Sequence, residues 1–507
     1  MKTHAVTLAM FASLAAGPLA AGQAIPTAVY TAFNPATNSF TFPIGGTRTF
    51  TSFNGIHRSP NGQRWLLVAN ISGDTGSDQA LIAGQGSART LVVQQGQAVP
   101  NLPTRNVNII DDHRINDAGQ FAFECNTTGS GSPSLLFHVG SLSPAVSFGY
   151  VAGSGEAVPF LAGSTYSGGY FGTLLDNTGR YGFQTGINDG ASTSAAIIFN
   201  GAVLSRAQDL GLAPIPGDPW AGYVQRRIFT DATGGRFLWW GATNGAPPTV
   251  SNVVALDNVP IVQVGSAIPG LADSTPVDSV FSVWLEPSGR WFVRGALGQA
   301  ATPAAERADF VYSNSTIVAR RGQPITPGSS ATWDRFTVTS TTNGFLFNVG
   351  NGRGDYAVAG WTLDGATRAP AVVLNGTTVV ARAGDPIDAN ADGQANDNAF
   401  IASFKQEIGQ GSAYLNDAGE LVMNVSARNA VGTTLGEAIV RLQLTLAPLA
   451  CRADFDQSGT RDVSDIFAFL SAWFAAGPGS DFDQSGTRDV SDIFAFLSAW
   501  FAGCPTP

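Results

Sequence analysis

The stretch Asn116-Asp117-Ala118-Gly119-Gln120-Phe121 has a close counterpart three hundred residues later, Asn416-Asp417-Ala418-Gly419-Glu420-Leu421. Both begin with a polar residue, place glycine at the fourth position and then enter a run of alternating apolar and polar residues. An Asn or Asp side chain caps a tight turn, and glycine takes the left-handed backbone conformation that such a turn requires. Each copy therefore predicts a turn followed by a β-strand.

This four-residue signature turn occurs seven times, with glycines 55 to 65 residues apart. The remaining copies are Ser59-Pro60-Asn61-Gly62, Asp176-Asn177-Thr178-Gly179, Asp231-Ala232-Thr233-Gly234, Glu286-Pro287-Ser288-Gly289 and the weaker Asn351-Gly352-Arg353-Gly354. A unit of about 60 residues has room for four short strands but cannot bury its own hydrophobic face, so several units must stack. Residues 89–96, 314–322 and 375–384 follow their signatures by a similar interval and are expected to form outer strands of the same units.

Stacking can be radial, as in a propeller, or linear, as in a solenoid. We favour a seven-unit β-propeller-like domain over residues 25–448, because ring closure removes exposed sheet edges and no polar capping segments for a solenoid are found. The repeats resemble the tandem-repeat domains with an Asn-x-x-Gly signature found in exported bacterial proteins. That resemblance implies a repeated β fold and carries no assigned chemistry.

Composition agrees with a mainly β protein. Only 13% of the 507 residues are charged, and there are 60 glycines and 32 phenylalanines against 3 methionines. The net charge of -10, with no run of basic residues, argues against nucleic acid or anionic lipid as a partner. Residues 1–24 have the layout of a secretory signal peptide, and no later stretch is long and apolar enough for a transmembrane helix. We therefore expect a secreted or cell-surface protein.

The strongest motif lies in residues 449–507, where 22 residues beginning at Asp454 return unchanged from Asp481, an offset of 27. Each copy matches a twelve-residue calcium loop, with oxygen-bearing side chains at positions 1, 3, 5, 9 and 12, a backbone carbonyl at position 7 and glycine at position 6. We expect two Ca²⁺ ions. The predicted ligands are Asp454, Asp456, Ser458, Thr460, Asp462 and Asp465 in the first loop, and Asp481, Asp483, Ser485, Thr487, Asp489 and Asp492 in the second.

An amphipathic helix is predicted after each loop, because apolar residues recur at i, i+3, i+4 and i+7 from Ile466 and from Ile493. A duplicated loop and helix with Asp at position 12 resembles a dockerin module, and the flanking Cys and the Gly503-Cys504 ending resemble the GC-type dockerin of exported bacterial proteins. The resemblance implies anchoring to a cohesin-like or cell-envelope receptor. Position 8 departs from the family, since a basic residue replaces the usual β-branched one. The residues implied to dock are Val463, Ser464, Val490 and Ser491, and the two basic residues are Arg461 and Arg488.

The chain has three cysteines. Cys451 and Cys504 bracket the duplicated segment in a compartment that permits disulfides, so we expect them to pair. Cys125 is expected to be a buried residue on a strand.

A weaker acidic loop begins at Asp388, with Asn390 and Asp392 at alternate positions but Ala399 at position 12. It is either a solvated loop or a third calcium site held by those three side chains.

Catalytic patterns are scarce. The histidines beyond residue 24 are His57, His113 and His138, and none has metal-ligand spacing. The group 111–113, Asp-Asp-His, precedes a signature turn and is expected to be a surface turn rather than an acid–base group. We therefore expect a non-enzymatic binding or surface protein, whose body takes a glycan or protein ligand, anchored through its tail. The alternative is a secreted carbohydrate-active enzyme with its active site in the propeller mouth, where a cluster of exposed carboxylates would favour the enzyme.

Overall fold

The computed structural model describes residues 24–446 and 453–503, apart from gaps at 35, 86–87, 130–132, 170–171, 246–251, 270–273, 300–301, 304–305, 338–339, 341, 408–410, 457, 459, 478 and 483–487. It separates into two compact units, Met1–Leu444 and Thr445–Pro507. Residues 1–23 of the predicted leader lie outside the described residues, as do Cys451 and Cys504 of the predicted disulfide. Within the described part of the chain, no helix is long and apolar enough to cross a membrane.

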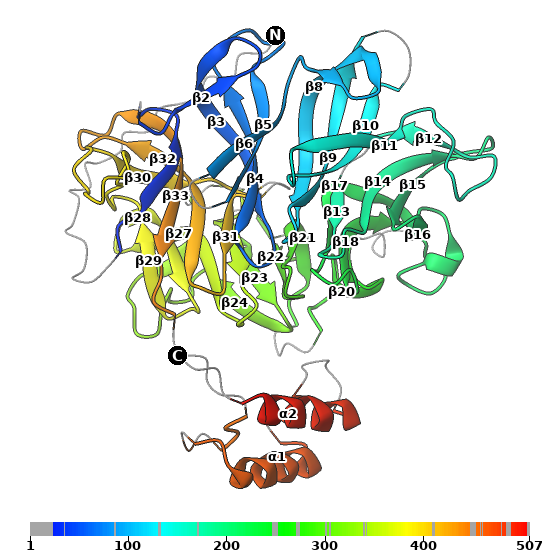
Figure 1. The fold of residues 1–507 in the computed structure, drawn as a ribbon. Helices are drawn as coiled ribbons and strands as arrows, with labels where there is room; N and C mark the ends of the chain where they lie inside the picture. The colour runs from blue at the N-terminus through cyan, green and yellow to red at the C-terminus, as the bar shows by residue number, and fades with distance from the viewer. Residues whose placement is uncertain are drawn as a thin grey trace. The chain divides into compact units, whose positions relative to one another are not determined.

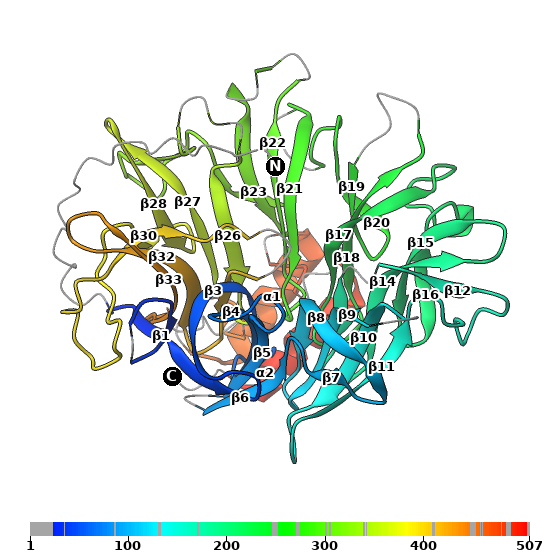
Figure 2. The same cartoon turned by 90° about the horizontal axis from the view of Figure 1, so that it is seen from above.

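The first unit is a seven-bladed β-propeller, as the seven signature turns predict (Figure 1). Its strands form seven antiparallel sheets, and Figure 2 shows these sheets arranged around a common centre. We number the blades from the first complete sheet in the sequence, so that the sheet which contains both chain-terminal strands of the unit is blade 7.

Each blade has four main strand positions. Blades 3, 6 and 7 divide the innermost strand in two, and blades 1 and 2 each begin with an additional short strand that pairs with the beginning of the long innermost strand. Blades 1 and 2 contain β2 (Ser39–Phe42), β3 (Gly46–Arg58), β4 (Arg64–Ile71), β5 (Gln79–Gln85) and β6 (Ala88–Gln94), then β7 (Ala98–Val99), β8 (Leu102–Ile115), β9 (Gln120–Thr128), β10 (Leu135–Ser141) and β11 (Ser147–Gly153). Blades 3 and 4 contain β12 (Thr165–Gly168), β13 (Thr173–Leu175), β14 (Tyr181–Asn188), β15 (Thr193–Phe199) and β16 (Ala202–Arg206), then, after the 3-10 turn η1 (Leu210–Leu212), β17 (Trp220–Thr230), β18 (Phe237–Thr243), β19 (Asn252–Leu256) and β20 (Val259–Gln263). Blades 5 and 6 contain β21 (Val277–Leu285), β22 (Trp291–Leu297), β23 (Ala308–Ser313) and β24 (Thr316–Arg320), then β25 (Thr332–Asp334), β26 (Phe345–Gly350), β27 (Tyr356–Asp364), β28 (Thr367–Leu374) and β29 (Thr378–Arg382). Blade 7 contains β30 (Phe400–Phe404), β31 (Ala413–Leu415), β32 (Glu420–Arg428), β33 (Thr434–Gln443) and β1 (Thr27–Thr31).

The ring closes through the first strand of the chain. β1 pairs antiparallel with β33, so the outermost strand of blade 7 comes from the N-terminal end of the unit. The register shifts by a β-bulge between Ala28 and Tyr30, which turns the Tyr30 side chain into the core shared with blade 1. Closure therefore depends on a pairing between residues about 400 positions apart.

Every signature turn joins the innermost strand of its blade, or the second segment of that strand where it is divided, to the next strand outward, including the weaker copy in blade 6. In all seven turns the glycine has a positive φ, between 62° and 92°, and its N–H donates to the carbonyl of the first turn residue. The segments predicted as outer strands are β6, β24 and β29, each at the outer edge of its sheet. Cys125 is buried in β9, as predicted.

The turns also connect neighbouring blades. The N–H of Asn61 donates to Asp117 Oδ1 at 2.8 Å, and the N–H of Asp117 donates to Asn177 Oδ1 at 3.1 Å. In the same way the N–H of Gly352 donates to Asp417 Oδ1 at 2.7 Å. Where the second residue of the signature is Asp or Asn, at positions 117, 177 and 417, its side chain therefore caps the turn of the preceding blade, a role that the hairpin pattern alone does not predict.

Buried ion pairs connect different blades. Glu407, between β30 and β31, accepts from Arg227 Nη1 at 2.7 Å and from Arg294 Nη2 at 2.5 Å, so it joins blades 4, 5 and 7. Asp309 and Arg335 form a second buried pair between blades 5 and 6 at 2.5 Å. Such pairs are costly to break singly, because the partner is left as an uncompensated buried charge.

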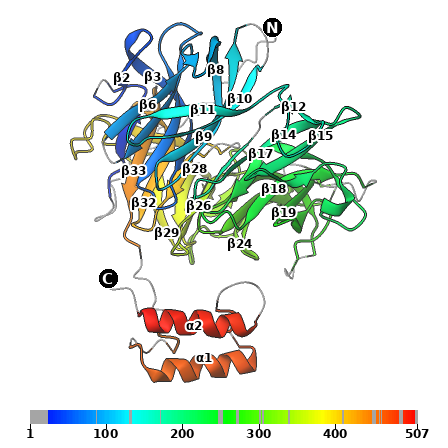
Figure 3. The same cartoon turned by 45° about the vertical axis from the view of Figure 1, so that its right-hand side comes forward.

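The second unit contains two helices of identical sequence, α1 (Val463–Ala475) and α2 (Val490–Ala502), which lie side by side in Figures 1 and 3. Phe469 and Phe496 are fully buried between them, with rings stacked at 4.3 Å and 12°. The apolar stripes predicted from the periodicity form this core. The mainly β fold with a small helical C-terminal unit is confirmed.

Candidate functional site

The first acidic loop brings three carboxylates together at the N-terminal end of α1. Asp454, Asp456 and Asp465 each offer an oxygen, and these oxygens lie within 4.8 Å of one another. Among the described residues, this is the one group of acidic, histidine or cysteine side chains close enough to share a metal ion. The Ser458 hydroxyl lies 3.4 Å from Asp454 Oδ1 and donates to the Thr460 carbonyl at 3.1 Å. These hard oxygen donors fit the all-oxygen shell that Ca²⁺ prefers.

Two of the predicted ligands also build the start of the helix. The Asp462 side chain accepts from the Ser464 N–H at 2.8 Å, and Asp465 Oδ2 accepts from the Asp462 N–H at 2.8 Å, which completes a capping box. Asp465 Oδ1 also accepts from the Asp456 N–H at 3.2 Å. Because position 9 of a calcium loop often binds its ion through water, the cap at Asp462 is compatible with the predicted ligand set.

The second loop is described only in part. Asp481, Asp489 and Asp492 are described, whereas Asp483, Ser485 and Thr487 lie outside the described residues. Asp489 and Asp492 form the same capping box as their counterparts, with Asp492 fully buried. The described residues of the second copy thus repeat the local geometry of the first.

The basic residues at loop position 8 bind the opposite helix. Arg488 Nη1 donates to the Trp473 carbonyl at 2.6 Å, and Arg461 Nη1 donates to the Trp500 carbonyl. Each guanidinium also lies 5.0 Å from the centroid of the same tryptophan ring. Two identical segments placed antiparallel produce this exchange, and each arginine satisfies a carbonyl at the C-terminal end of the other helix. The departure from the dockerin pattern therefore has a structural role in this chain.

The residues implied to dock are all exposed at the first turn of the helices. Val463 and Val490 are 58% and 57% exposed, and Ser464 and Ser491 are exposed beside them. Two phenylalanines on each helix are also exposed, by 65–75%, an unusual feature for side chains of this size. These are Phe467, Phe474, Phe494 and Phe501.

The weaker acidic loop lies between β29 and β30. Asp388 is buried, and its carboxylate accepts from the N–H groups of Asp392 at 3.1 Å and Gly393 at 2.9 Å. Asn390 Nδ2 donates to Asp392 Oδ2 at 3.0 Å. These bonds give the Asp388 side chain a structural role in the turn beside β1, whose Ala28 N–H donates to the Asp388 carbonyl.

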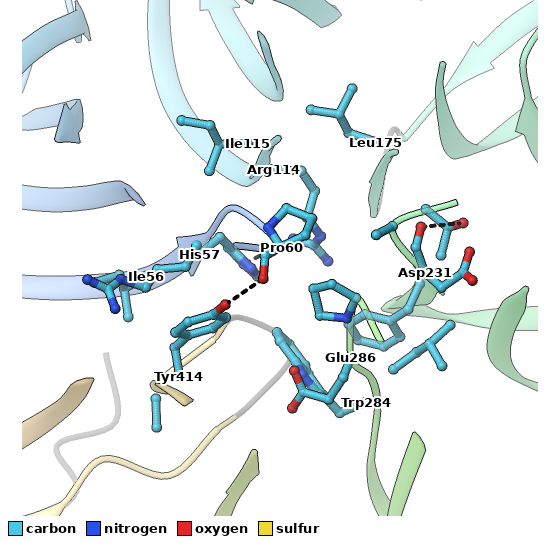
Figure 4. Close-up of a pocket in the computed structure, with 17 residues that line it drawn as sticks. Ile56, His57, Pro60, Arg114, Ile115, Leu175, Asp231, Trp284, Glu286 and Tyr414 are labelled. Atoms are coloured by element: carbon cyan, nitrogen blue, oxygen red, sulfur yellow. Dashed lines mark hydrogen bonds between the residues drawn. The ribbon is translucent and has the colours of Figure 1, made fainter. Parts of the chain in front are cut away.

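A central pocket of ≈ 60 Å³ opens where the inner strands meet their signature turns, and side chains from blades 1, 2, 3, 4, 5 and 7 line it. In five blades the lining includes the residue two positions before the first signature residue. These residues are His57, Arg114, Phe229, Trp284 and Tyr414. Figure 4 shows four of them, His57, Arg114, Trp284 and Tyr414, converging from different blades. A second cavity of ≈ 160 Å³ adjoins the pocket across Pro60, Pro287 and Tyr414.

Polar side chains at the central pocket form hydrogen bonds with one another. Arg114 Nη1 donates to His57 Nε2 at 3.0 Å and to Asp112 Oδ1 at 2.7 Å. Burial, together with the nearby Arg114 charge, holds the pKa of His57 well below its usual range, so the imidazole is neutral at pH 7. The His57 ring stacks on Trp284 at 5.7 Å, and the Tyr414 hydroxyl donates to the Pro60 carbonyl at 3.1 Å (Figure 4).

The carboxyl groups of the central pocket accept hydrogen bonds from backbone N–H groups of the turns and of the next blade. Glu286 is 1% exposed and accepts from the Gly350 N–H of the next blade at 2.8 Å, and burial raises its pKa to about 8. Asp231 is 7% exposed and accepts from the Gly235 N–H at 3.0 Å. A pair of solvent-exposed carboxylates, the feature that would favour glycoside hydrolysis, is not found among the described lining residues.

The prediction of a surface turn at residues 111–113 is wrong. These residues lie in β8, where Asp112 and His113 are fully buried. Asp112 Oδ2 accepts from the Thr173 N–H of blade 3 at 2.7 Å, so the acidic pair links blades. A bulge in β8 between Ile110 and His113 accommodates the two aspartates, and bulges of this kind are not visible in a sequence pattern.

No protein-family model matches the chain, and no curated protein matches its sequence. Solved structures with a similar fold include a prolyl endopeptidase (13% identity, TM-score 0.36, covering 78% of this chain and 51% of that one) and the polysaccharide lyase Uly1 (10%, 0.35, 83% and 98%). Dipeptidyl peptidase 4 of Porphyromonas gingivalis is a third (10%, 0.34, 82% and 59%). The chain spans about half the length of the prolyl endopeptidases it matches. Similarities this low say nothing about what the chain binds, and the propeller assignment rests on its own sheet topology.

Proposed function

We propose that this chain is an exported, non-enzymatic binding or surface protein, in which a propeller is held in place by a calcium-dependent, dockerin-like C-terminal module. One observation carries the proposal: the carboxylates of Asp454, Asp456 and Asp465 converge within 4.8 Å at the start of α1. Three carboxylates so close repel one another until a cation neutralises them. Calcium binding and ordering of the helix are therefore expected to be coupled.

The antiparallel symmetry of the module supports a docking role. Each loop leads into a helix whose exposed face begins with Val463 or Val490 and continues with two phenylalanines. A cohesin-like or cell-envelope receptor would bind this face, and calcium would set its shape by fixing the start of each helix. The proposed ligand of the propeller, a glycan or a protein, would bind at the central pocket.

The second candidate, a secreted carbohydrate-active enzyme, needs one ionised and one protonated carboxyl group within reach of a sugar. In the central pocket, Glu286 has the raised pKa of a proton donor. However, Asp231 and Glu286 are both buried and both bind backbone N–H groups of the turns. This burial makes a binding role the better supported of the two.

Titration calorimetry on the intact, chelator-treated protein tests the proposal. We expect uptake of two calcium ions, loss of that uptake when Asp454 and Asp481 are both replaced by Ala, and no loss in the control Asp74→Ala, whose side chain is exposed in the propeller. Capture from cell-envelope extracts should then require calcium. Absence of calcium uptake by the wild-type protein would overturn the proposal.

A further inference from the structure

A cavity of ≈ 50 Å³ lies at the seam where the ring closes, between blade 7 and blade 1. We call it the seam pocket. Its polar and aromatic lining is Tyr30 of β1, Arg58 of β3, Trp65 of β4, Glu420 of β32 and Arg441 of β33. The remaining walls are apolar side chains. The pocket is separate from the calcium loops and shares only Ile56 and Arg58 with the central pocket.

Buried donors without acceptors distinguish this pocket. Within the described part of the chain, the Tyr30 hydroxyl and the Nε and Nη1 atoms of Arg58 have no hydrogen-bond partner, although all three atoms are buried. Tyr30 is 0% exposed and the Arg58 side chain is 9% exposed. Buried polar groups in folded proteins nearly always find a partner, so these donors point to a bound group.

The charge balance of the pocket is positive. Arg58 forms an ion pair with Glu420 through Nη2, whereas Arg441, which is exposed on β33, makes no side-chain hydrogen bond or ion pair with any described residue. The guanidinium of Arg89 lies 4.4 Å from the Tyr30 ring and adds a third positive charge. Two arginines and one glutamate thus line the pocket, and Arg89 lies beside it, in a chain whose net charge is -10.

We propose that the seam pocket is a carboxylate-binding site. A carboxylate only accepts hydrogen bonds, so it complements the free N–H groups of Arg58 and the Tyr30 hydroxyl, and it neutralises the excess charge of Arg441. The cavity volume suits a group of this size, with the apolar walls around the attached carbon. The source is either a small free acid or the carboxylate of a sugar acid, which the same donors would recognise.

Binding would act on closure of the ring. Tyr30 belongs to the closing strand β1, and Arg58 belongs to the first complete blade, so both reach one ligand only when β1 is paired with β33. A ligand that binds only the closed state lowers the population of the open state by the factor 1 + L/Kd, where L is the free ligand concentration and Kd its dissociation constant. At a ligand concentration ten times the dissociation constant, exchange of the β1 amides should slow about tenfold.

The test is hydrogen exchange of residues 27–31 in the full-length protein, measured by mass spectrometry in sodium acetate, sodium glucuronate and sodium chloride at equal ionic strength and pH. Saturation-transfer NMR on the acetate methyl group detects binding directly. We expect acetate to slow exchange relative to chloride. An effect of acetate alone identifies a small free acid, and an equal effect of glucuronate identifies the carboxylate of a sugar acid.

Tyr30→Phe is the decisive variant because it removes only the hydroxyl. Since that hydroxyl has no partner among the described residues, the variant should fold, and its β1 amides should exchange no faster than those of the wild type in chloride. Its affinity for acetate should fall about tenfold, because one hydrogen bond to the carboxylate is lost. Arg58→Lys should weaken the acetate effect in the same direction. Arg236→Lys, in an exposed ion pair with Asp257 on blade 4, is the matched control and should keep the full effect.

Either of two results would overturn the proposal. One is the absence of any difference between carboxylates and chloride with the wild-type protein. The other is faster β1 exchange in Tyr30→Phe without acetate, which would mean that the hydroxyl already serves the fold.

Discussion

Replacing Asp454 by Asn should change the stability of α1 in opposite directions with and without calcium. Asp454 lies in the cluster with Asp456 and Asp465, and the three oxygens are within 4.8 Å of one another. At that distance two like charges repel by about 1 kcal/mol in water and by more where solvent is excluded. Removing one charge relieves two such pairs, and salt screening reduces the gain to about 1–2 kcal/mol. The amide keeps an oxygen that can accept from Ser458.

Calcium reverses the direction in which Asp454→Asn changes the stability of α1. In the wild-type protein, calcium at a thousand times its dissociation constant should stabilise the module by about 4 kcal/mol. Asp454→Asn removes a charged ligand at position 1 of the loop, so most of that gain should disappear for α1. The variant is thus expected to be more stable than the wild type in chelator and less stable in calcium.

Hydrogen exchange of residues 463–475 in the full-length protein measures both effects, because each 1.4 kcal/mol changes a local opening constant tenfold. We expect exchange about tenfold slower than wild type in chelator, and far faster than wild type in calcium. Asp74→Asn, at an exposed site in the propeller, controls for net charge. If Asp454→Asn exchanges faster than wild type in chelator and keeps the full calcium response, the repulsion argument and the ligand assignment are both wrong.

Three further predictions concern residues placed by the structure. The pKa of Glu286 is about 8 in the folded protein, so the unfolded chain loses this proton first as pH rises and stability falls between about pH 4.5 and 8. Glu286→Gln should flatten that decline and make the protein more stable at pH 8, by on the order of 4 kcal/mol in urea unfolding. A pH profile identical to wild type would contradict it. Glu407→Gln leaves two buried arginines without their counter-ion and should destabilise the propeller by about 3–5 kcal/mol in the same assay. A loss below 1 kcal/mol would show that the pair is not buried in solution. Arg461→Met and Arg488→Met should each speed amide exchange at the end of the opposite helix, by similar factors of about tenfold, because each removes one carbonyl hydrogen bond and one ring contact. Unequal effects of the two substitutions would contradict the reciprocal contacts in which each arginine binds the opposite helix.

The local features of this protein could be predicted from its sequence because they depend on residues near one another in the chain. The turn glycines, such as Gly119 and Gly419, take positive φ for the reason that the pattern indicated, and seven of them imply a closed ring. The helix after each acidic loop and its apolar stripe follow from a short periodicity. The oxygen-bearing positions of the first loop, from Asp454 to Asp465, could likewise be predicted from the calcium-loop pattern. Three of its carboxylates converge in the structure.

The central pocket and the seam pocket could not be predicted in this way. His57, Arg114 and Trp284 come from three blades and meet only because the ring closes. Each lies two positions before a signature turn, but this shared position indicates a common site only once the turns are known to lie on one face of the propeller. Bulges such as that at Asp111 and Asp112 were missed because an extra residue in a strand leaves no periodic trace.

The sequence by itself determined the repeat, the turn chemistry and the acidic loops, since each is set by interactions within a few tens of residues. Tertiary structure alone decided which charges are buried and which donors meet. Tyr30 and Arg58 illustrate the difference: the first lies on a strand that pairs with residues about 400 positions away, so their shared cavity exists only when β1 completes blade 7. Burial and long-range pairing are properties of the closed ring, and no local pattern of residues encodes them.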